Sequence, residues 1–371
     1  MRFVTPALKH IVFPALSRSG YLRYTAANGP TVVTYHGVFP TRYKIKTPSL
    51  DGNLVHSASL RQQVHLLKTH YNVISPEDFL HWLEQPFSNE RRSGEKLPPR
   101  SILLTCDDAL RNTLTEMSPL LQEASVSCLF FATGASAGDA PSMLWYEELY
   151  LLLLYARERI TINLPEVTLP PRPVGLNERH ACWWNLVEQL SQFDQERRRQ
   201  LLDQIRDQLG HPPGWKDALL ESSADADRFL TLNASGLRQL ASAGMAIGAH
   251  TLSHPILART SDELAATEIS QSRTDLEKAV GQTISTFAYP FGTTTTVTTR
   301  DMHFAEQAGF QCAFMNSGGP VSSKSTRFAL PRIHITANMS LSEFEAHISG
   351  FHRSLHHRFR RGDNLETASS S

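Results

Sequence analysis

The feature that most constrains the fold is a regular alternation of short apolar runs with segments of helical pattern. Thr31–Tyr35 (TVVTY), Ser101–Cys106 (SILLTC) and Val126–Thr133 (VSCLFFAT) are largely apolar runs, which are typical of parallel strands buried on both faces. Segments in which apolar residues recur at helical spacing separate them. The alternation resumes later with a strand that ends at His250 and a helix over 262–280. It predicts an α/β fold in which βα units surround a parallel sheet or barrel.

The alternation is interrupted between about residues 139 and 228. This stretch holds a helix rich in Trp, Tyr and Leu, a strand-like run over 160–169, and a charged amphipathic helix. We expect a mostly helical insertion within one catalytic domain that spans residues 29–350. A basic segment over 1–28 precedes this domain, and a tail over 351–371, basic at first and then disordered, follows it.

Charge and cysteine content narrow the class of partner and the compartment. The 36 basic residues equal the 36 acidic ones, so wholesale binding to nucleic acid is not expected. The first 46 residues are an exception, because they carry seven basic residues and no acid. We expect a solvated arm here, and keep weak peripheral contact with an anionic membrane as the alternative. The four cysteines lack zinc-finger or disulfide spacing, and no apolar run reaches the roughly 18 residues of a membrane span. We therefore expect a cytoplasmic protein without a transmembrane segment.

Ionisable residues follow two of the expected strands. Asp107 and Asp108 come directly after the SILLTC run, and His250 ends a later strand, four residues before His254. Because parallel strands bring their carboxyl ends to one face, these side chains are expected to meet there. Two imidazoles and one carboxylate suit a divalent metal with open positions, and the second carboxylate suits a base.

Each motif has a plainer explanation when it is taken alone. Acidic residues before a helix are common caps, so the aspartate pair by itself favours capping. The HxxxH spacing carries little weight alone, since His352 and His356 repeat it in a basic terminal segment. Only the placement at strand ends favours a metal site.

In these motifs the sequence resembles the polysaccharide deacetylases, the NodB-homology class of carbohydrate esterase family four. Leu104–Ala109 (LTCDDA) is similar to the family's Thr-Phe-Asp-Asp-Gly motif, and His250–His254 (HTLSH) matches its His-Ser/Thr-x-x-His motif in full. Phe287–Gly292 (FAYPFG) is similar to its aromatic-proline motif, and Leu330–His334 (LPRIH) to a late strand. The resemblance runs from about residue 31 to 335, apart from the insertion, and implies a distorted (β/α) barrel.

The resemblance implies a role for each matching residue. Asp107 would be the catalytic base, and Asp108, His250 and His254 would bind a divalent metal, for which zinc is expected. The general acid comes from an early Tyr-His motif in one branch of the family, which Tyr35-His36 matches, and from a late motif in others, which His334 matches imperfectly. We expect His36 to be the acid and keep His334 as the alternative.

The sequence also departs from the family pattern. Ala109 replaces a customary glycine, so a left-handed backbone there would cost about 1 kcal/mol or more. Ala288 stands where many members have an arginine that orients the base. These departures put catalytic efficiency in question but leave the ligands and the base in place.

The resemblance implies an enzyme, a hydrolase of non-peptide carbon–nitrogen bonds that removes acetyl from an amino sugar in a polysaccharide or glycan precursor. The alternatives are hydrolysis of another non-peptide amide at the same site, and a catalytically inactive glycan-binding homologue. Four aromatic residues of the insertion suit sugar stacking, although core packing is the favoured interpretation: Trp145, Tyr146, Trp183 and Trp184.

Overall fold

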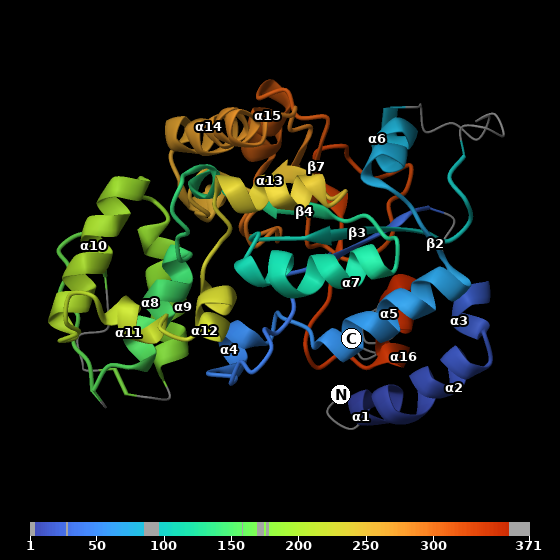
Figure 1. The fold of residues 1–371 in the computed structure, drawn as a ribbon, viewed down its shortest axis with the longest axis horizontal. Helices are drawn as coiled ribbons and strands as arrows, with labels where there is room; N and C mark the ends of the chain where they lie inside the picture. The colour runs from blue at the N-terminus through green and yellow to red at the C-terminus, as the bar shows by residue number, and fades with distance from the viewer. Residues whose placement is uncertain are drawn as a thin grey trace, which may run out of the picture.

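Short parallel strands form a sheet that nearly closes into a barrel (Figure 1). The computed structural model describes residues 4–26, 29–84, 96–157, 159–168, 174–175 and 178–355. Every strand pairing in these residues is parallel, and the spatial order is β8-β7-β6-β5-β4-β3-β1-β9, with β2 beside β3. The strands are β1 Thr31–Tyr35, β2 Asn72–Val73, β3 Ser101–Cys106, β4 Leu129–Ala132, β5 Ala246–Ala249, β6 Thr286–Ala288, β7 Cys312–Met315, β8 Leu330–Pro331 and β9 Ile333–His334. The predicted α/β barrel class is confirmed.

The segment over 330–334 links the two edges of this sheet. β8 pairs with β7 at one edge, and β9 pairs with β1 at the other, although a single residue, Arg332, separates the two strands in sequence. The chain therefore crosses the opening of the barrel at Arg332. This crossing places that side chain beside the ends of β1 and β3.

Helices cover the outer face of the sheet and bury alternate strand residues. Val33, Leu104 and Phe130 belong to the large apolar cluster that the covering helices complete. Their neighbours Val32, Leu103 and Phe131 belong to a second cluster on the opposite, inner face. The helical elements around the barrel are α4 Pro48–Asp51, α5 Ser57–His70, α6 Pro76–Glu84, η3 Thr113–Met117, α7 Ser118–Glu123, η4 Gly134–Ala137, α13 Ala234–Ser242, η6 Leu257–Arg259, α14 Asp262–Val280, α15 Thr299–Gln307 and α16 Leu341–Ile348.

Residues 145–229, between β4 and β5, form a helical body beside the barrel (Figure 1). Its helices are α8 Trp145–Leu154, α9 Arg179–Leu190, α10 Gln195–Gln208, α11 Trp215–Leu219 and α12 Ser223–Phe229. They share their own apolar cluster, which includes Leu149, Leu186 and Leu201. The expected strand-like run over 160–169 is wrong for the described residues 159–168, since Ile160 makes only an isolated bridge to Val174.

The basic N-terminal segment folds into short helices that pack beside α16. These are α1 Val4–Ala7, the π-helical turn η1 Leu8–Val12, α2 Phe13–Arg18 and α3 Tyr21–Tyr24. Phe13 and Leu22 form a small apolar cluster with Ala346 of α16. Within the described residues no helix has the length and apolar character that a bilayer crossing requires. The helix that begins at Phe351 is described to Leu355, and the rest of the expected disordered tail lies outside the described residues.

Candidate metal and catalytic site

The alternation of side chains along the strands aims three predicted site residues at the inside of the barrel. Asp107 continues the inward set of β3, two residues beyond Thr105, and His36 continues that of β1. His250 follows β5 in the same way, and its amide donates to Ala132 O of β4 at 2.8 Å. The ends of three strands therefore supply side chains to one face.

Asp107 and Asp108 occupy a tight turn at the end of β3. Their side chains are buried, at 1% and 3% exposure. Asp108 and Ala109 both have left-handed backbones, with φ of 70° and 44°. The family's glycine position thus does need positive φ here, and alanine tolerates it at a cost of about 1–2 kcal/mol. The turn sends the two carboxylates in different directions.

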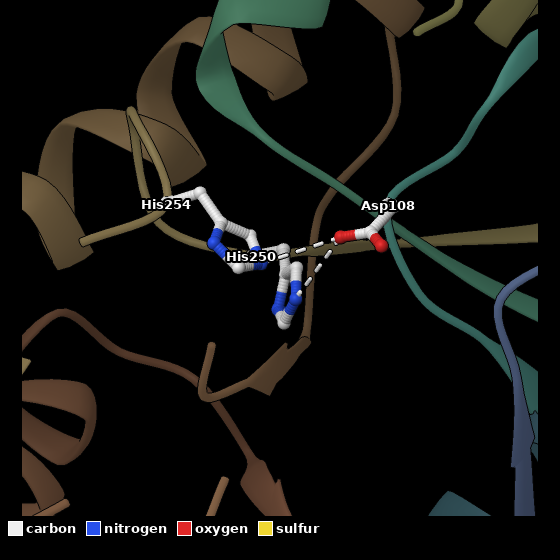
Figure 2. Close-up of side chains that lie close together, drawn as sticks. All are labelled: Asp108, His250 and His254. Atoms are coloured by element: carbon white, nitrogen blue, oxygen red, sulfur yellow. Dashed lines mark ion pairs between the residues drawn. The ribbon is translucent and has the colours of Figure 1, made fainter. Parts of the chain in front are cut away.

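Asp108, His250 and His254 come together as the metal hypothesis requires (Figure 2). Their ligand atoms lie within 4.8 Å of one another. Asp108 Oδ1 is 3.7 Å from His250 Nε2 and 3.3 Å from His254 Nε2, so both imidazoles face the same carboxylate oxygen.

The donors of this cluster fit a divalent cation. His250 Nδ1 lies 2.7 Å from the Ala288 carbonyl, which fixes the tautomer with its lone pair on Nε2. Burial lowers the pKa of His250 to about 4, so this imidazole is neutral at pH 7 and free to bind metal. Asp108 Oδ1 is buried and lacks a hydrogen-bond partner among the described residues. Burial alone would raise the pKa of Asp108, but His254 outweighs it and holds that pKa below its usual range.

The helical insertion holds the loop that carries both histidines. Thr251 and His254 have left-handed backbones, with φ of 62° and 60°. Trp145 of α8 donates its indole N–H to the His254 carbonyl at 3.0 Å, and Arg198 of α10 donates to the Ser253 carbonyl at 3.0 Å. From the barrel side, Glu268 accepts from the Ser253 amide at 2.8 Å. These bonds offset the strain of the loop.

Arg332 is a site residue that sequence reasoning missed. Its guanidinium donates to both oxygens of Asp107 at 2.6 Å, and both side chains are buried. Burial alone would raise the pKa of Asp107, but the Arg332 charge outweighs it and holds that pKa below its usual value. Two sequence features could have indicated this role. Ala288 occupies a position where many family members have an arginine, and the late strand motif contains an arginine, Arg332.

The structure brings both candidate general acids to the site. His36 follows β1 and His334 ends β9, and their ring centroids lie 4.7 Å apart. Gly37 turns the chain away with φ of 115°, where a Cβ would lie 2.0 Å from Asn112 Oδ1. Burial, with the charge of His36 as a second cause, lowers the pKa of His334 to about 3. His334 is therefore neutral at pH 7.

The four aromatic residues of the insertion divide into two pairs. Trp145 and Trp183 are buried, at 8% and 7% exposure, as core packing predicts. Tyr146 and Trp184 are only partly buried. The Tyr146 ring lies 4.8 Å from that of His254, and Phe291 contacts both His254 and Trp184. An aromatic wall of Tyr146, Trp184 and Phe291 thus lies beside the Asp108-His250-His254 cluster.

Comparison with known proteins gives a family-model match over part of the chain. Residues 219–313 match the family model described as polysaccharide deacetylase, a segment that includes His250 and His254 but not Asp107. No curated protein matches the chain.

Solved structures of deacetylases share the fold. The Streptococcus pyogenes deacetylase PplD, solved in complex with acetate, is 16% identical with a TM-score of 0.53, covering 86% of this chain and 98% of that one. IcaB from Ammonifex degensii is 13% identical with a TM-score of 0.52, and the match covers 87% of this chain and 98% of that one. A de-N-acetylase from Aggregatibacter actinomycetemcomitans is 12% identical with a TM-score of 0.51, covering 85% and 98%. Part of this chain thus matches the polysaccharide deacetylase family model, and most of the chain shares the fold of these deacetylase structures.

Proposed function

We propose that the protein is a metal-dependent deacetylase that hydrolyses the N-acetyl amide of an amino sugar in a polysaccharide or glycan precursor. The observation that carries this proposal is the convergence of a buried Asp-His-His cluster with a second carboxylate that an arginine orients. A ligand site alone needs no such second carboxylate. Its retention favours hydrolysis over a purely structural metal.

Asp108, His250 and His254 would hold the metal, and zinc suits two imidazoles and one carboxylate with open positions. The bound ion would supply Lewis acidity toward the acetamide carbonyl and lower the pKa of water. Asp107, ionised and held by Arg332, would accept the proton of the attacking water. The bidentate contact fixes the direction of its lone pairs, which is the geometric requirement for a general base.

His36 is the proposed general acid that protonates the departing amine. A general acid must carry its proton at working pH, and the lowered pKa of His334 leaves that imidazole neutral at pH 7. A neutral ring beside His36 suits a hydrogen-bond acceptor and not a proton donor. The lowered pKa of His334 and the position of His36 at the same site therefore support His36 as the acid.

The aromatic wall supports a sugar as the substrate. Tyr146, Trp184 and Phe291 are partly exposed beside the metal ligands, and flat amphipathic rings suit the apolar face of a pyranose. The left-handed Ala109 is the feature that favours the alternative, an inactive glycan-binding homologue. The Arg332–Asp107 pair argues against it, because binding of a glycan does not require an oriented base.

Acetate release tests the proposal. Purified protein is supplemented with zinc, cobalt, nickel or iron, its metal content is measured, and each form is incubated with N-acetylated oligosaccharides and non-sugar acetamides. We expect one bound metal and acetate release from an amino-sugar substrate. Metal binding without acetate release from any substrate would support the inactive homologue.

A further inference from the structure

The N-terminal helices carry an unusual outer surface. α1, η1 and α2 follow one another over residues 4–18, and α3 completes the segment. Their inner side packs on α16, through Phe13 and Leu22. In Figure 1 these helices lie at the end of the molecule opposite the helical insertion. They contain none of the site residues.

Large apolar side chains gather on the outside of these helices. Tyr24 is 90% exposed, Ile11 67% and Tyr21 46%, and Leu341 at the start of α16 is 37% exposed. They are four of the six large apolar residues that are exposed in the described part of the chain. Single exposed apolar residues are ordinary, but a group on one small helical unit indicates an interaction surface.

The exposed charges of α1, η1, α2, α3 and the segment from Leu341 to Leu355 are all positive. Among the described residues 4–26 and 341–355, the only acids are Glu343 and Glu345, and both are buried. Glu343 pairs with Lys9 at 3.1 Å, and Glu345 pairs with Arg23 at 2.6 Å. Burial of these carboxylates removes negative charge from the surface.

What remains outside is basic. His10, Arg18 and Arg353 are exposed, and none of the exposed residues of the unit is acidic. The sequence then continues with HHRFRR over 356–361, which adds three arginines and no acid. A surface that exposes apolar and aromatic side chains among cations, and no exposed anion, is complementary to an anionic bilayer.

We propose that the outer surface of α1, η1, α2, α3 and α16 docks on an anionic phospholipid bilayer. Ile11, Tyr21 and Tyr24 enter the headgroup region, while Arg18 and Arg353 face the phosphates. Two weak signals, apolar insertion and charge, act together, which is the condition for stable peripheral attachment.

Vesicle co-sedimentation of the full chain tests this inference. We expect binding to vesicles of mixed phosphatidylglycerol and phosphatidylcholine, weak binding to phosphatidylcholine alone, and loss of binding in high salt. Arg18→Glu should lower the partition coefficient by about 5- to 30-fold, since each basic residue near the surface contributes about 1 kcal/mol. The double variant Ile11→Ser, Tyr24→Ser should lower it about tenfold or more.

The chain offers matched controls. Ile45 and Tyr155 are also exposed, at 56% and 48%, but lie outside this unit, so Ile45→Ser, Tyr155→Ser should bind vesicles like the unmodified chain. Arg199, 65% exposed on α10, is the control for Arg18 when changed to glutamate. Deacetylation of a water-soluble substrate should stay unchanged in all variants.

Equal binding to neutral and anionic vesicles, or equal losses in test and control variants, would overturn the inference. A concentration-dependent dimer that disappears in Ile11→Ser, Tyr24→Ser, without vesicle binding by the parent, would assign the surface to a second copy of the chain and overturn it as well.

Discussion

Arg332 and Asp107 form a bidentate ion pair inside the barrel, with both N–O distances at 2.6 Å and both side chains excluded from solvent. Arg332 also lies over the rings of Phe131 and Phe314, at 5.3 and 5.9 Å. The strand crossing between β8 and β9 therefore supplies the arginine that is absent at Ala288. Asp107 is ionised and oriented before any substrate arrives.

Arg332→Met should shift the acidic limb of the kcat/KM profile to higher pH. Without the guanidinium, burial raises the pKa of Asp107, and a base must be ionised to work. Misorientation of the carboxylate should also lower kcat by about 10²-fold, and the unpaired buried charge should destabilise the fold by about 3–5 kcal/mol. Urea unfolding and pH-rate profiles measure these effects.

The control for Arg332 is the double variant Arg332→Met, Asp107→Asn. It removes both charges, so it should recover most of the lost stability without recovering activity. If the pH profile of the Arg332→Met enzyme were unchanged, Arg332 would have no part in lowering the pKa of Asp107.

The two aspartates should separate base from ligand. Asp107→Asn should abolish acetate release and leave metal content near that of the unmodified chain, because this carboxylate contacts Arg332 and not the histidines. Asp108→Asn should lower both, because Asp108 Oδ1 faces the two imidazoles. Metal analysis alongside acetate release measures the difference. Equal metal loss in the two variants would contradict the assignment, and His254→Ala serves as the ligand-loss control.

His36→Ala should lower kcat by about 10²–10⁴-fold with little change in metal content, since it removes the proposed proton donor. His334→Ala should cost less, because its lowered pKa leaves the ring without the acidic imidazolium proton at pH 7. The two rings are in contact, so His334→Ala is expected to lower kcat to a smaller extent through the changed position of the His36 ring. A larger kcat loss in His334→Ala would give the acid role to His334.

Trp145→Phe should weaken metal binding by about tenfold, a typical cost of losing a residue that holds a ligand in place. The change removes the indole N–H that donates to the His254 carbonyl. That carbonyl then stays buried without this hydrogen bond, which costs free energy. Competition with a chelator measures the affinity. Trp183→Phe removes a similar bond, to the Tyr146 carbonyl at 2.8 Å, outside the histidine loop. It should lower stability without changing metal affinity, and equal effects in both would count against the proposed role of Trp145.

The sequence alone determined the architecture and the core of the candidate site. The apolar composition of runs such as SILLTC predicts strands that are buried on both faces. The carboxyl ends of parallel strands lie on one face of the sheet. That rule, with the family motifs, was enough to expect Asp107, Asp108, His250 and His254 together. The departure from glycine at Ala109 was also visible in the sequence, and the structure shows that this position has positive φ.

Only the tertiary structure decided which residues surround that core. Arg332 reaches Asp107 because two strands of two residues each join opposite edges of the barrel, and such short strands leave no periodic signal. His36 and His334 meet because β1 pairs with β9, a contact between residues about 300 apart in sequence. Trp145 and Tyr146 are adjacent in sequence but differ in their surroundings. The packing of the insertion on the barrel buries the Trp145 ring and leaves the Tyr146 ring beside His254. Local patterns record apolar spacing and turn preference, whereas these contacts depend on how distant segments close the barrel.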